Sequence, residues 1–385
     1  MQPLSARAAG FTDSMIRRMT RVSLRHAAVN LSQGFPDTGP PEAVVQRLIE
    51  VARAGPHQYS ITWGAANFRQ ALAEKQSRLM GWEIDPEQEI VVTCGATEAM
   101  MAAMLTVVDP GDKVAVFSPF YENYGADAIL AGAEPLYVPL SPPDFALDQE
   151  ALEAVFARRP KALILCNPSN PCGRVFTLEE LSAIAGLARR YDAYVLTDEV
   201  YEHIVYPPHR HIYFASLPGM RERTLSCSSL SKTYSMTGWR LGYIIAPPDI
   251  AEAARKVHDF LTVGAPAPLQ EAAVAGLRLP EAYYRDLAEG YRDKRDFFLQ
   301  GLDEIGLSHN TPQGTYYVLV DVSAFGQEDD VAFCEALAAR VGVGAVPGCI
   351  FFQERASGLI RLHFARQRPV LEETLRRLAG IGDKI

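Results

Sequence analysis

One lysine of this chain stands among hydroxyl-bearing residues, in the run Ser-Leu-Ser-Lys-Thr-Tyr-Ser at 229–235. This lysine, Lys232, is followed eight residues later by an arginine, Arg240. An amine in such a segment can form a Schiff base with an aldehyde, while a guanidinium and hydroxyl groups such as that of Ser229 can hold a phosphate. The segment therefore indicates a site for an aldehyde cofactor that also carries a phosphate.

Polar residues that could complete such a site follow several short apolar runs. The turn Gly-Ala-Thr at 95–97 can cradle a phosphate on its backbone N–H groups, and Asp198 can pair with a protonated ring nitrogen. Tyr201 and Asn170, the latter in Asn-Pro-Ser-Asn-Pro-Cys-Gly at 167–173, can address a ring oxygen. Taken singly, each has a plain structural interpretation as a strand-to-helix turn, a solvated strand end, a self-capped loop or a core tyrosine.

Three further residues also have both a functional and a purely structural interpretation. Arg361 alternates with apolar neighbours in Ile-Arg-Leu-His-Phe at 360–364, where a guanidinium could clamp a substrate carboxylate or form a structural salt bridge. Tyr121 could stack on a cofactor ring or simply pack in the core, and Tyr59 has the same alternative.

The elements that must position these residues alternate along the chain. Seven apolar runs predict strands, at 90–93, 113–117, 135–138, 162–165, 193–197, 224–227 and 241–245. Helical patterns lie between them, at 98–108, 150–157 and 178–190. Unbroken apolar strands that alternate with helices predict an α/β core, with a mostly parallel seven-stranded sheet covered on both faces. The carboxyl ends of such strands form one edge, where ligands bind.

The sequence changes character after about residue 262. Long charged helices are predicted at 280–305, 329–341 and 370–381, with short strands at 315–320 and 358–363, which favours a smaller α+β domain. An amphipathic helix is also predicted at 13–28.

The lysine segment, with Thr-Gly-Trp-Arg at 237–240, resembles that of the pyridoxal-phosphate aminotransferases of class I/II, the fold-type-I family. The order of the elements along the chain, over about residues 31–364, is also that of the family. These elements are the phosphate turn, the stacking aromatic, the paired asparagines, the Asp/Tyr strand end, the lysine and two arginines. The resemblance implies an enzyme (EC 2.6.1.-) that moves the amino group of an L-amino acid to a 2-oxo acid. It also implies a large cofactor-binding domain at 35–262 and a small domain formed by 1–34 and 263–385.

The resemblance assigns roles to individual residues. Lys232 carries the cofactor as a Schiff base, Asp198 meets the pyridine nitrogen, and Tyr201 and Asn170 address the phenolic oxygen. The other implied contacts are the phosphate with Ala96, Thr97, Ser229 and Arg240, the ring with Tyr121, and the substrate with Gly34, Asn170 and Arg361. Tyr59 would reach the phosphate of the other subunit, so a homodimer with shared active sites is implied.

Bulk properties narrow the class of partner. The chain has 385 residues, is 48% hydrophobic and carries a net charge of −9, which argues against nucleic acid or an anionic membrane as the main partner. No apolar run approaches the ~20 residues that span a bilayer. The six cysteines show no metal-ligand spacing, and the chain opens without a secretory pattern, so we expect a cytoplasmic protein without a metal site.

Two sequence signals point to different branches of the family. The runs at 31–37 and 314–317 resemble enzymes that handle methionine, glutamine and kynurenine, whereas Ser231 and Arg240 favour the aspartate and aromatic branch. No second arginine is evident opposite a side-chain carboxylate, so a neutral, sulfur-containing or aromatic donor is expected. A carbon–sulfur β-lyase on the same fold is the alternative. A non-catalytic cofactor-sensing domain is more remote, since only about 30 residues precede Gly34, too few for a DNA-binding module.

Overall fold

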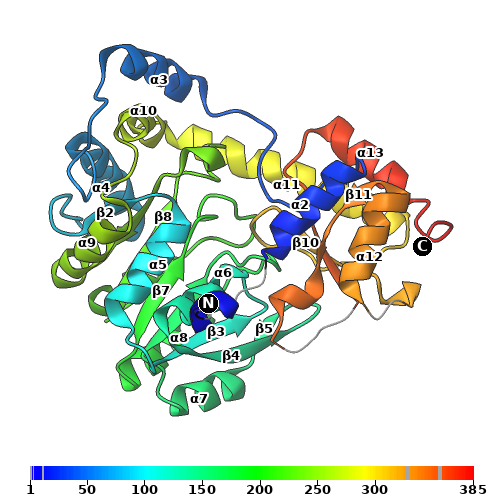
Figure 1. The fold of residues 1–385 in the computed structure, drawn as a ribbon, viewed down its shortest axis with the longest axis horizontal. Coiled ribbons are helices and arrows are strands. Elements are labelled where there is room, and N and C mark those ends of the chain that lie inside the picture. The colour runs from blue at the N-terminus through cyan, green and yellow to red at the C-terminus, as the bar shows by residue number, and fades with distance from the viewer. Residues whose placement is uncertain (1, 3, 11–12, 327–328, 354–357) are drawn as a thin grey trace.

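The computed structural model describes residues 2, 4–10, 13–326, 329–353 and 358–385. Within these residues, the largest sheet has eight strands in the order β2-β9-β8-β7-β6-β3-β4-β5 (Figure 1). Its strands are β2 (Ile90–Thr93), β3 (Lys113–Ser118), β4 (Glu134–Ser141), β5 (Ala146–Leu147), β6 (Ala162–Cys166), β7 (Tyr194–Asp198), β8 (Thr224–Ser229) and β9 (Gly242–Ile245).

The directions of the strands agree with a mostly parallel sheet. Strands β4, β3, β6, β7 and β8 run parallel to one another, whereas β9 runs antiparallel to both β2 and β8. All seven predicted strands are present. The eighth, β5, pairs antiparallel with β4 and was not predicted, because two residues are too few to give a periodic pattern.

Both faces of the sheet are buried under helices. Val114 and Val116 of β3 pack in one hydrophobic cluster with α5 (Ala96–Val107) and α9 (Pro248–Thr262). Ala115 and Phe117, which point the other way, pack with α7 (Gln149–Ala157) and α8 (Leu178–Arg190). This alternation explains why the strands read as continuous apolar runs.

A second, smaller sheet lies beside the first (Figure 1). Its three described strands have the antiparallel order β10-β13-β12. They are β10 (Tyr317–Asp321), β12 (Val346–Pro347) and β13 (Leu359–His363), and they are accompanied by α11 (Glu281–Glu304), α12 (Asp330–Ala336), a π-helical turn (Leu337–Val341) and α13 (Arg368–Leu378). The predicted N-terminal helix is α2 (Met15–Arg25). Its Met19 and Val22 join the core of this part, as the resemblance implied.

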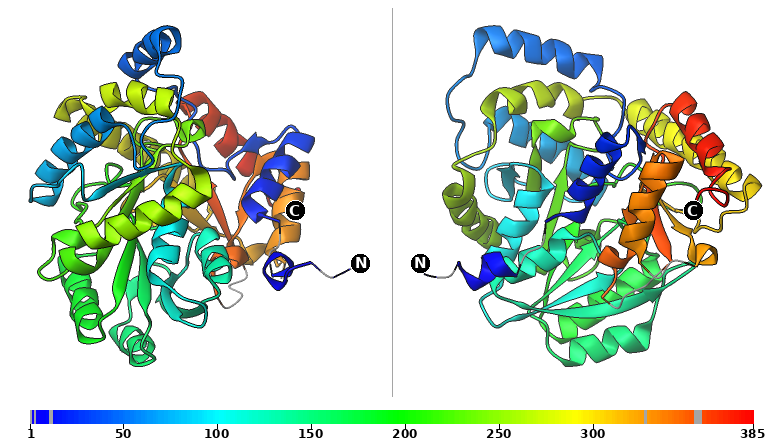
Figure 2. Two further views of the ribbon diagram at one scale, coloured as in Figure 1. Left: turned by 60° about the vertical axis from the view of Figure 1, so that its left-hand side comes forward. Right: turned by 45° about the vertical axis from the view of Figure 1, so that its right-hand side comes forward.

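Three helices that were not predicted pack at the opposite end of the molecule. They are α3 (Glu42–Ala54), α4 (Ala66–Met80) and α10 (Ala267–Leu277), and α10 contacts both of the others (Figure 2). The remaining elements are α1 (Ala6–Ala9), α6 (Asn123–Ala131), the parallel pair β1 (Val29–Asn30) and β11 (Val343–Gly344), and short 3₁₀ turns. Among the described residues, no helix has the length and apolar character that a membrane span requires.

Candidate active site

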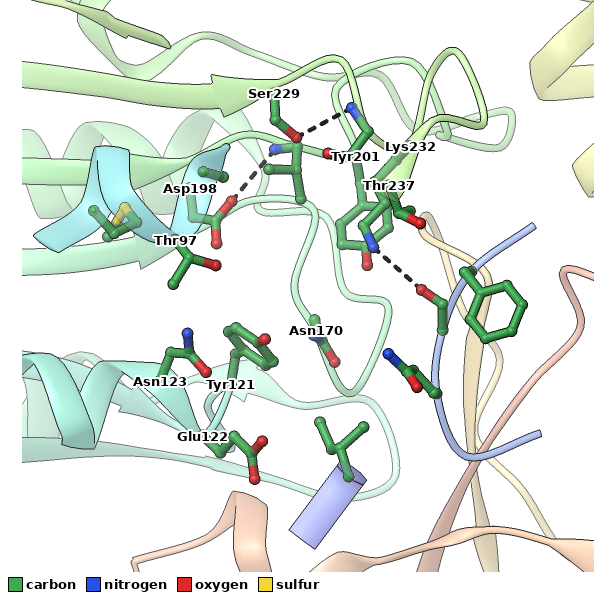
Figure 3. Close-up of a pocket in the computed structure, with 18 of the residues that line it drawn as sticks. Thr97, Tyr121, Glu122, Asn123, Asn170, Asp198, Tyr201, Ser229, Lys232 and Thr237 are labelled. Carbon is green, nitrogen blue, oxygen red and sulfur yellow. Dashed lines mark hydrogen bonds between the residues drawn. The ribbon is translucent and has the colours of Figure 1, made fainter. Parts of the chain in front are cut away.

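A cavity of about 470 Å³ opens where the carboxyl ends of the central strands face the second sheet (Figure 3). Every site residue predicted from the sequence lines it except Tyr59, whose side chain is 86% exposed on the surface of this chain. The predicted residues that line it are Gly34, Ala96, Thr97, Tyr121, Asn170, Asp198, Tyr201, Ser229, Lys232, Arg240 and Arg361. The size lies within the range of small-molecule sites.

Lys232 lies in a turn that follows β8. Backbone bonds from Leu230 to Leu241 and from Met236 to Ser231 close this turn and direct the lysine into the cavity. The Nζ atom donates to the carbonyl oxygen of Gly34 at 3.2 Å. Burial lowers the pKa of Lys232 below its ordinary value, although the nearby Asp198 opposes the change. A larger fraction of the amine is therefore neutral and nucleophilic near neutral pH.

Asp198 ends β7 and is buried within the cavity wall. The hydroxyl of Tyr124 donates to its Oδ2 at 2.7 Å, and the backbone N–H of Val200 approaches its Oδ1 at 3.4 Å. Burial raises the pKa of Asp198, while the Tyr124 hydrogen bond holds it down. A buried carboxylate of this kind is stabilised by a cationic hydrogen-bond donor.

A cradle for an anion lies at the first turn of α5. Gly95 caps this helix with φ of 86°, a conformation that favours glycine, and the helix begins at Ala96 and Thr97. A Cβ atom at Gly95 would lie 2.5 Å from Nη2 of Arg240. Backbone N–H groups of the first helical turn, a helix dipole and a guanidinium thus meet at one place, together with Ser229 of β8. This combination suits a phosphate.

Arg361 is a buried cation on β13, 1% exposed. Its Nη1 donates to Oδ1 of Asn170 at 2.7 Å, and its Nη2 donates to the carbonyl oxygen of Ser32 at 2.9 Å. Its Nε has no hydrogen-bond partner, and within the described part of the chain no carboxylate forms an ion pair with it. The structural salt bridge considered for this residue is therefore not formed, and a substrate carboxylate could supply the counter-charge.

Aromatic side chains and one glycine form the remaining wall. The hydroxyl of Tyr201 donates to that of Tyr317 at 3.1 Å, and Tyr121 packs edge-on against Tyr124 with ring centroids 5.8 Å apart. A Cβ atom at Gly34 would overlap the Tyr317 hydroxyl, so glycine alone fits there in this arrangement.

The chain was compared with protein families and with solved structures. Residues 27–378 match the model of the family described as aminotransferase class I and II. This chain belongs to that family. It is 37% identical to the methionine aminotransferase of Escherichia coli, with 95% of each chain covered. It is 34% identical to human kynurenine–oxoglutarate transaminase 1, with 91% of this chain and 92% of that one covered.

A solved structure supports the same assignment. The N-succinyldiaminopimelate aminotransferase of Mycobacterium tuberculosis superposes with a TM-score of 0.94 at 37% identity, over 98% of this chain and 99% of the other. The chain is thus a pyridoxal-phosphate-dependent aminotransferase of fold type I. The predicted family, fold class, activity and cofactor are confirmed, and these relatives give the β-lyase alternative no added support.

The residues of this aminotransferase fit pyridoxal phosphate. An amine of lowered pKa, an anion cradle and a buried carboxylate line a single cavity, and a buried arginine that pairs with no carboxylate of the described residues faces the same space. When bound, this cofactor supplies an electron sink for negative charge that develops at the substrate Cα. These four features match its aldehyde, phosphate, ring nitrogen and amino-acid partner respectively.

Several lining residues were not predicted from the sequence. Arg17 comes from α2 and Ser14 caps that helix, while Tyr124 and Asp127 come from α6 and Tyr317 from β10. Neither of the two helical segments carries a motif, and only the folded chain brings them to the sheet edge. The run at 314–317 resembles one branch of the family, but the sequence gives its tyrosines no role in the site.

Proposed function

We propose that this aminotransferase works through Lys232, Asp198 and Arg361 as its central residues. Arg361 is the observation that carries the proposal. Its buried guanidinium pairs with no carboxylate in the described parts of the chain and shares a cavity with an amine of lowered pKa. This pair of groups fits a substrate with an α-amino and an α-carboxylate group. Bidentate binding of that carboxylate then orients the Cα proton.

In this proposal, Lys232 would hold the cofactor through its Nζ, and its free amine would act as a general base toward the Cα proton of the substrate. Its lowered pKa supports that role, since the freed amine is neutral in a larger fraction of molecules and can move the Cα proton. Asp198 holds a proton on the ring nitrogen, and the Tyr124 hydroxyl orients Asp198. Tyr201 donates towards the phenolic oxygen.

The remaining assignments concern binding. Asn170, whose Oδ1 accepts a hydrogen bond from Arg361, positions that guanidinium and addresses the phenolic oxygen. The phosphate is held by Ala96, Thr97, Ser229 and Arg240, the ring by Tyr121, and the substrate also by Gly34.

We propose a homodimer in which Tyr59 completes the partner's active site. Tyr59 is 86% exposed and Phe260 is 92% exposed. Thr62, which follows Tyr59 in the same loop, donates to Asp259 at 3.2 Å, so the loop that carries Tyr59 lies against the helix that carries Phe260. Mixing Tyr59→Ala and Lys232→Ala subunits tests this, since each hybrid dimer would contain one intact site. Restored activity supports shared sites, and no restoration after subunit exchange contradicts them.

The preferred donor is proposed to be neutral, sulfur-containing or aromatic. Phe35, Tyr121, Tyr317 and Ile16 give the cavity an apolar wall that suits such side chains. Arg17 also lines the cavity and is exposed, which offers an acidic side chain a place to bind. The donor panel must therefore include glutamate and aspartate, with an Arg17→Leu variant to separate the two classes.

The experiment uses the cofactor-loaded enzyme and one amino acid at a time, without an oxo acid. Stoichiometric loss of the cofactor's aldehyde absorbance with methionine, glutamine or phenylalanine would establish the donor class. Release of pyruvate with the absorbance restored would indicate β-elimination instead. No change across the panel would contradict the proposed site.

Two broader proposals remain. We infer a large domain that begins near residue 35 and a small domain that includes the N-terminal helix. The packing of α10 on α3 and α4 favours a second boundary after Leu277 over the predicted one at 262. Limited proteolysis of the linking segments tests this division. The cytoplasm is the proposed compartment, which is consistent with Cys94, Cys166, Cys172, Cys227 and Cys334 forming no disulfide bond among the described residues.

A further inference from the structure

The cavity contains a second buried carboxyl group that none of the roles above uses. Asp127 lies on α6, lines the same cavity as Asp198, and is 4% exposed. Its Oδ2 atom is enclosed and has no hydrogen-bond partner among the residues that the structure describes. Buried polar atoms are almost always paired, so an unpaired carboxyl oxygen at a cavity wall indicates that something else completes it.

The charge on Asp127 depends on its surroundings. Burial, followed by the charge of Asp198, raises the pKa of Asp127 to about 7. Two carboxylates in one low-dielectric site cannot both ionise without cost, so one of them keeps a proton. Asp198 is the one that accepts the Tyr124 hydroxyl and an N–H group, which favours its charged form. Asp127 has no such support and takes the proton.

The other titratable groups around α6 do not neutralise Asp127. Cys227 of β8 stays a neutral thiol, since burial and the neighbouring carboxylates hold its pKa well above the ordinary value. On α5, which packs against α6, Glu98 is engaged by a histidine of α9. On β4, burial raises the pKa of Tyr137, so it stays uncharged.

We propose that Asp127 is a second cofactor-binding carboxyl group, which gives up its proton to solvent when the positively charged pyridine ring binds and regains one when the ring leaves. A cation placed beside Asp198 removes the repulsion that keeps Asp127 protonated. The cavity wall would then carry two negative charges in place of one. This inference rests on the cofactor site proposed above.

The proton released by Asp127 makes cofactor affinity depend on pH, and this linkage gives the sign and size of that dependence. Below the pKa of free Asp127, binding must expel a proton and is weakened; above it, no such cost arises. The pKa of Asp127 in the cofactor-free protein is about 7. Between pH ~6 and pH ~8, the cofactor affinity of wild type should therefore increase by about tenfold more than the affinity of Asp127→Asn, whose side chain cannot titrate. Asparagine keeps the shape of the side chain, so packing is preserved.

The test measures binding and not turnover. Cofactor-free wild type, Asp127→Asn and the exposed-surface control Glu153→Gln are titrated with pyridoxamine 5′-phosphate, which lacks the aldehyde and so forms no bond with Lys232. Calorimetry in buffers of different ionisation enthalpy gives both the Kd and the protons released. Wild type and control should release about one proton more than Asp127→Asn near pH ~6 and the same number near pH ~8.

Three outcomes would overturn the proposal. One is a ratio of the two Kd values that does not change with pH, and another is equal proton release by wild type and variant. If Asp127→Asn does not fold, the test uses wild type alone. Inorganic phosphate is then the control ligand, because its binding shows how many protons are released by titration of the phosphate group itself. The third outcome that would overturn the proposal is then a proton release that is no larger for pyridoxamine 5′-phosphate than for phosphate. Failure of wild type to bind the ligand at all would instead refute the cofactor site.

Discussion

Replacement of Tyr124 by phenylalanine removes one hydrogen bond from a buried carboxylate and leaves the ring in place. The bond from the Tyr124 hydroxyl to Asp198 is 2.7 Å long, and both side chains are buried. Hydrogen bonds to charged groups contribute about 1.5–3 kcal/mol. Because one pKa unit corresponds to about 1.4 kcal/mol, the pKa of Asp198 should rise further, by about one to two units. Cofactor affinity should fall by about tenfold or more.

The assay for Tyr124→Phe has two readouts. Cofactor affinity is measured by titration of the cofactor-free protein, and the pH dependence of the single-turnover reaction with a saturating donor is measured in parallel. A carboxyl of raised pKa is protonated at higher pH, so the acid limb should move upward by about one to two pH units. The control is Tyr137→Phe, whose ring packs on Phe120 outside the cavity. An unmoved acid limb with wild-type affinity would refute the reasoning.

Three other substitutions give separate expectations. Arg361→Lys keeps the charge but loses the two-pronged guanidinium, so initial-rate kinetics should show a KM for the donor raised about tenfold or more, with unchanged cofactor affinity. Gly34→Ala places a methyl group on the Tyr317 hydroxyl, so kcat/KM should fall about tenfold or more while the bound cofactor's absorbance persists. Burial opposes the charge of Glu202, but Lys75, whose Nζ lies 3.7 Å from Oε1, together with His203 and the Tyr213 hydroxyl, lowers the pKa of Glu202 to about 2. Glu202→Gln should therefore lower the free energy of unfolding in urea by about 3–5 kcal/mol near neutral pH, since it leaves the buried Lys75 without its carboxylate, and a wild-type midpoint would contradict this. The ionised Glu202 stabilises the protein above about pH 4.3, and this contribution is lost as the pH falls towards 2.

The central sheet could be predicted because its strands are buried on both faces. Such strands are continuous apolar runs, and helix α8 is equally clear because Thr177 and Glu180 form a capping box before an amphipathic stretch. Helices α3, α4 and α10 were missed, since their sequences carry no motif and their packing partners are distant along the chain. The short β5 depends wholly on its pairing with β4.

The site residues also fall into some that the sequence predicts and others that only the folded structure reveals. Asp198 and Ser229 end strands of the sheet, and Lys232 follows β8 directly, so their convergence follows from topology. Tyr124 and Asp127 lie one turn apart on α6, where the sequence gives no sign that this helix faces the strand ends. Their importance comes from burial beside Asp198, which only the folded chain reveals.

The central claim is that Lys232 performs amino exchange within this cavity. The most direct measurement is a single turnover of cofactor-loaded wild type and Lys232→Ala with one good donor, without added amine. Wild type should convert its bound cofactor stoichiometrically and form one equivalent of oxo acid. Lys232→Ala should bind the cofactor yet form no oxo acid on that timescale. Conversion by Lys232→Ala at the wild-type rate would contradict the account.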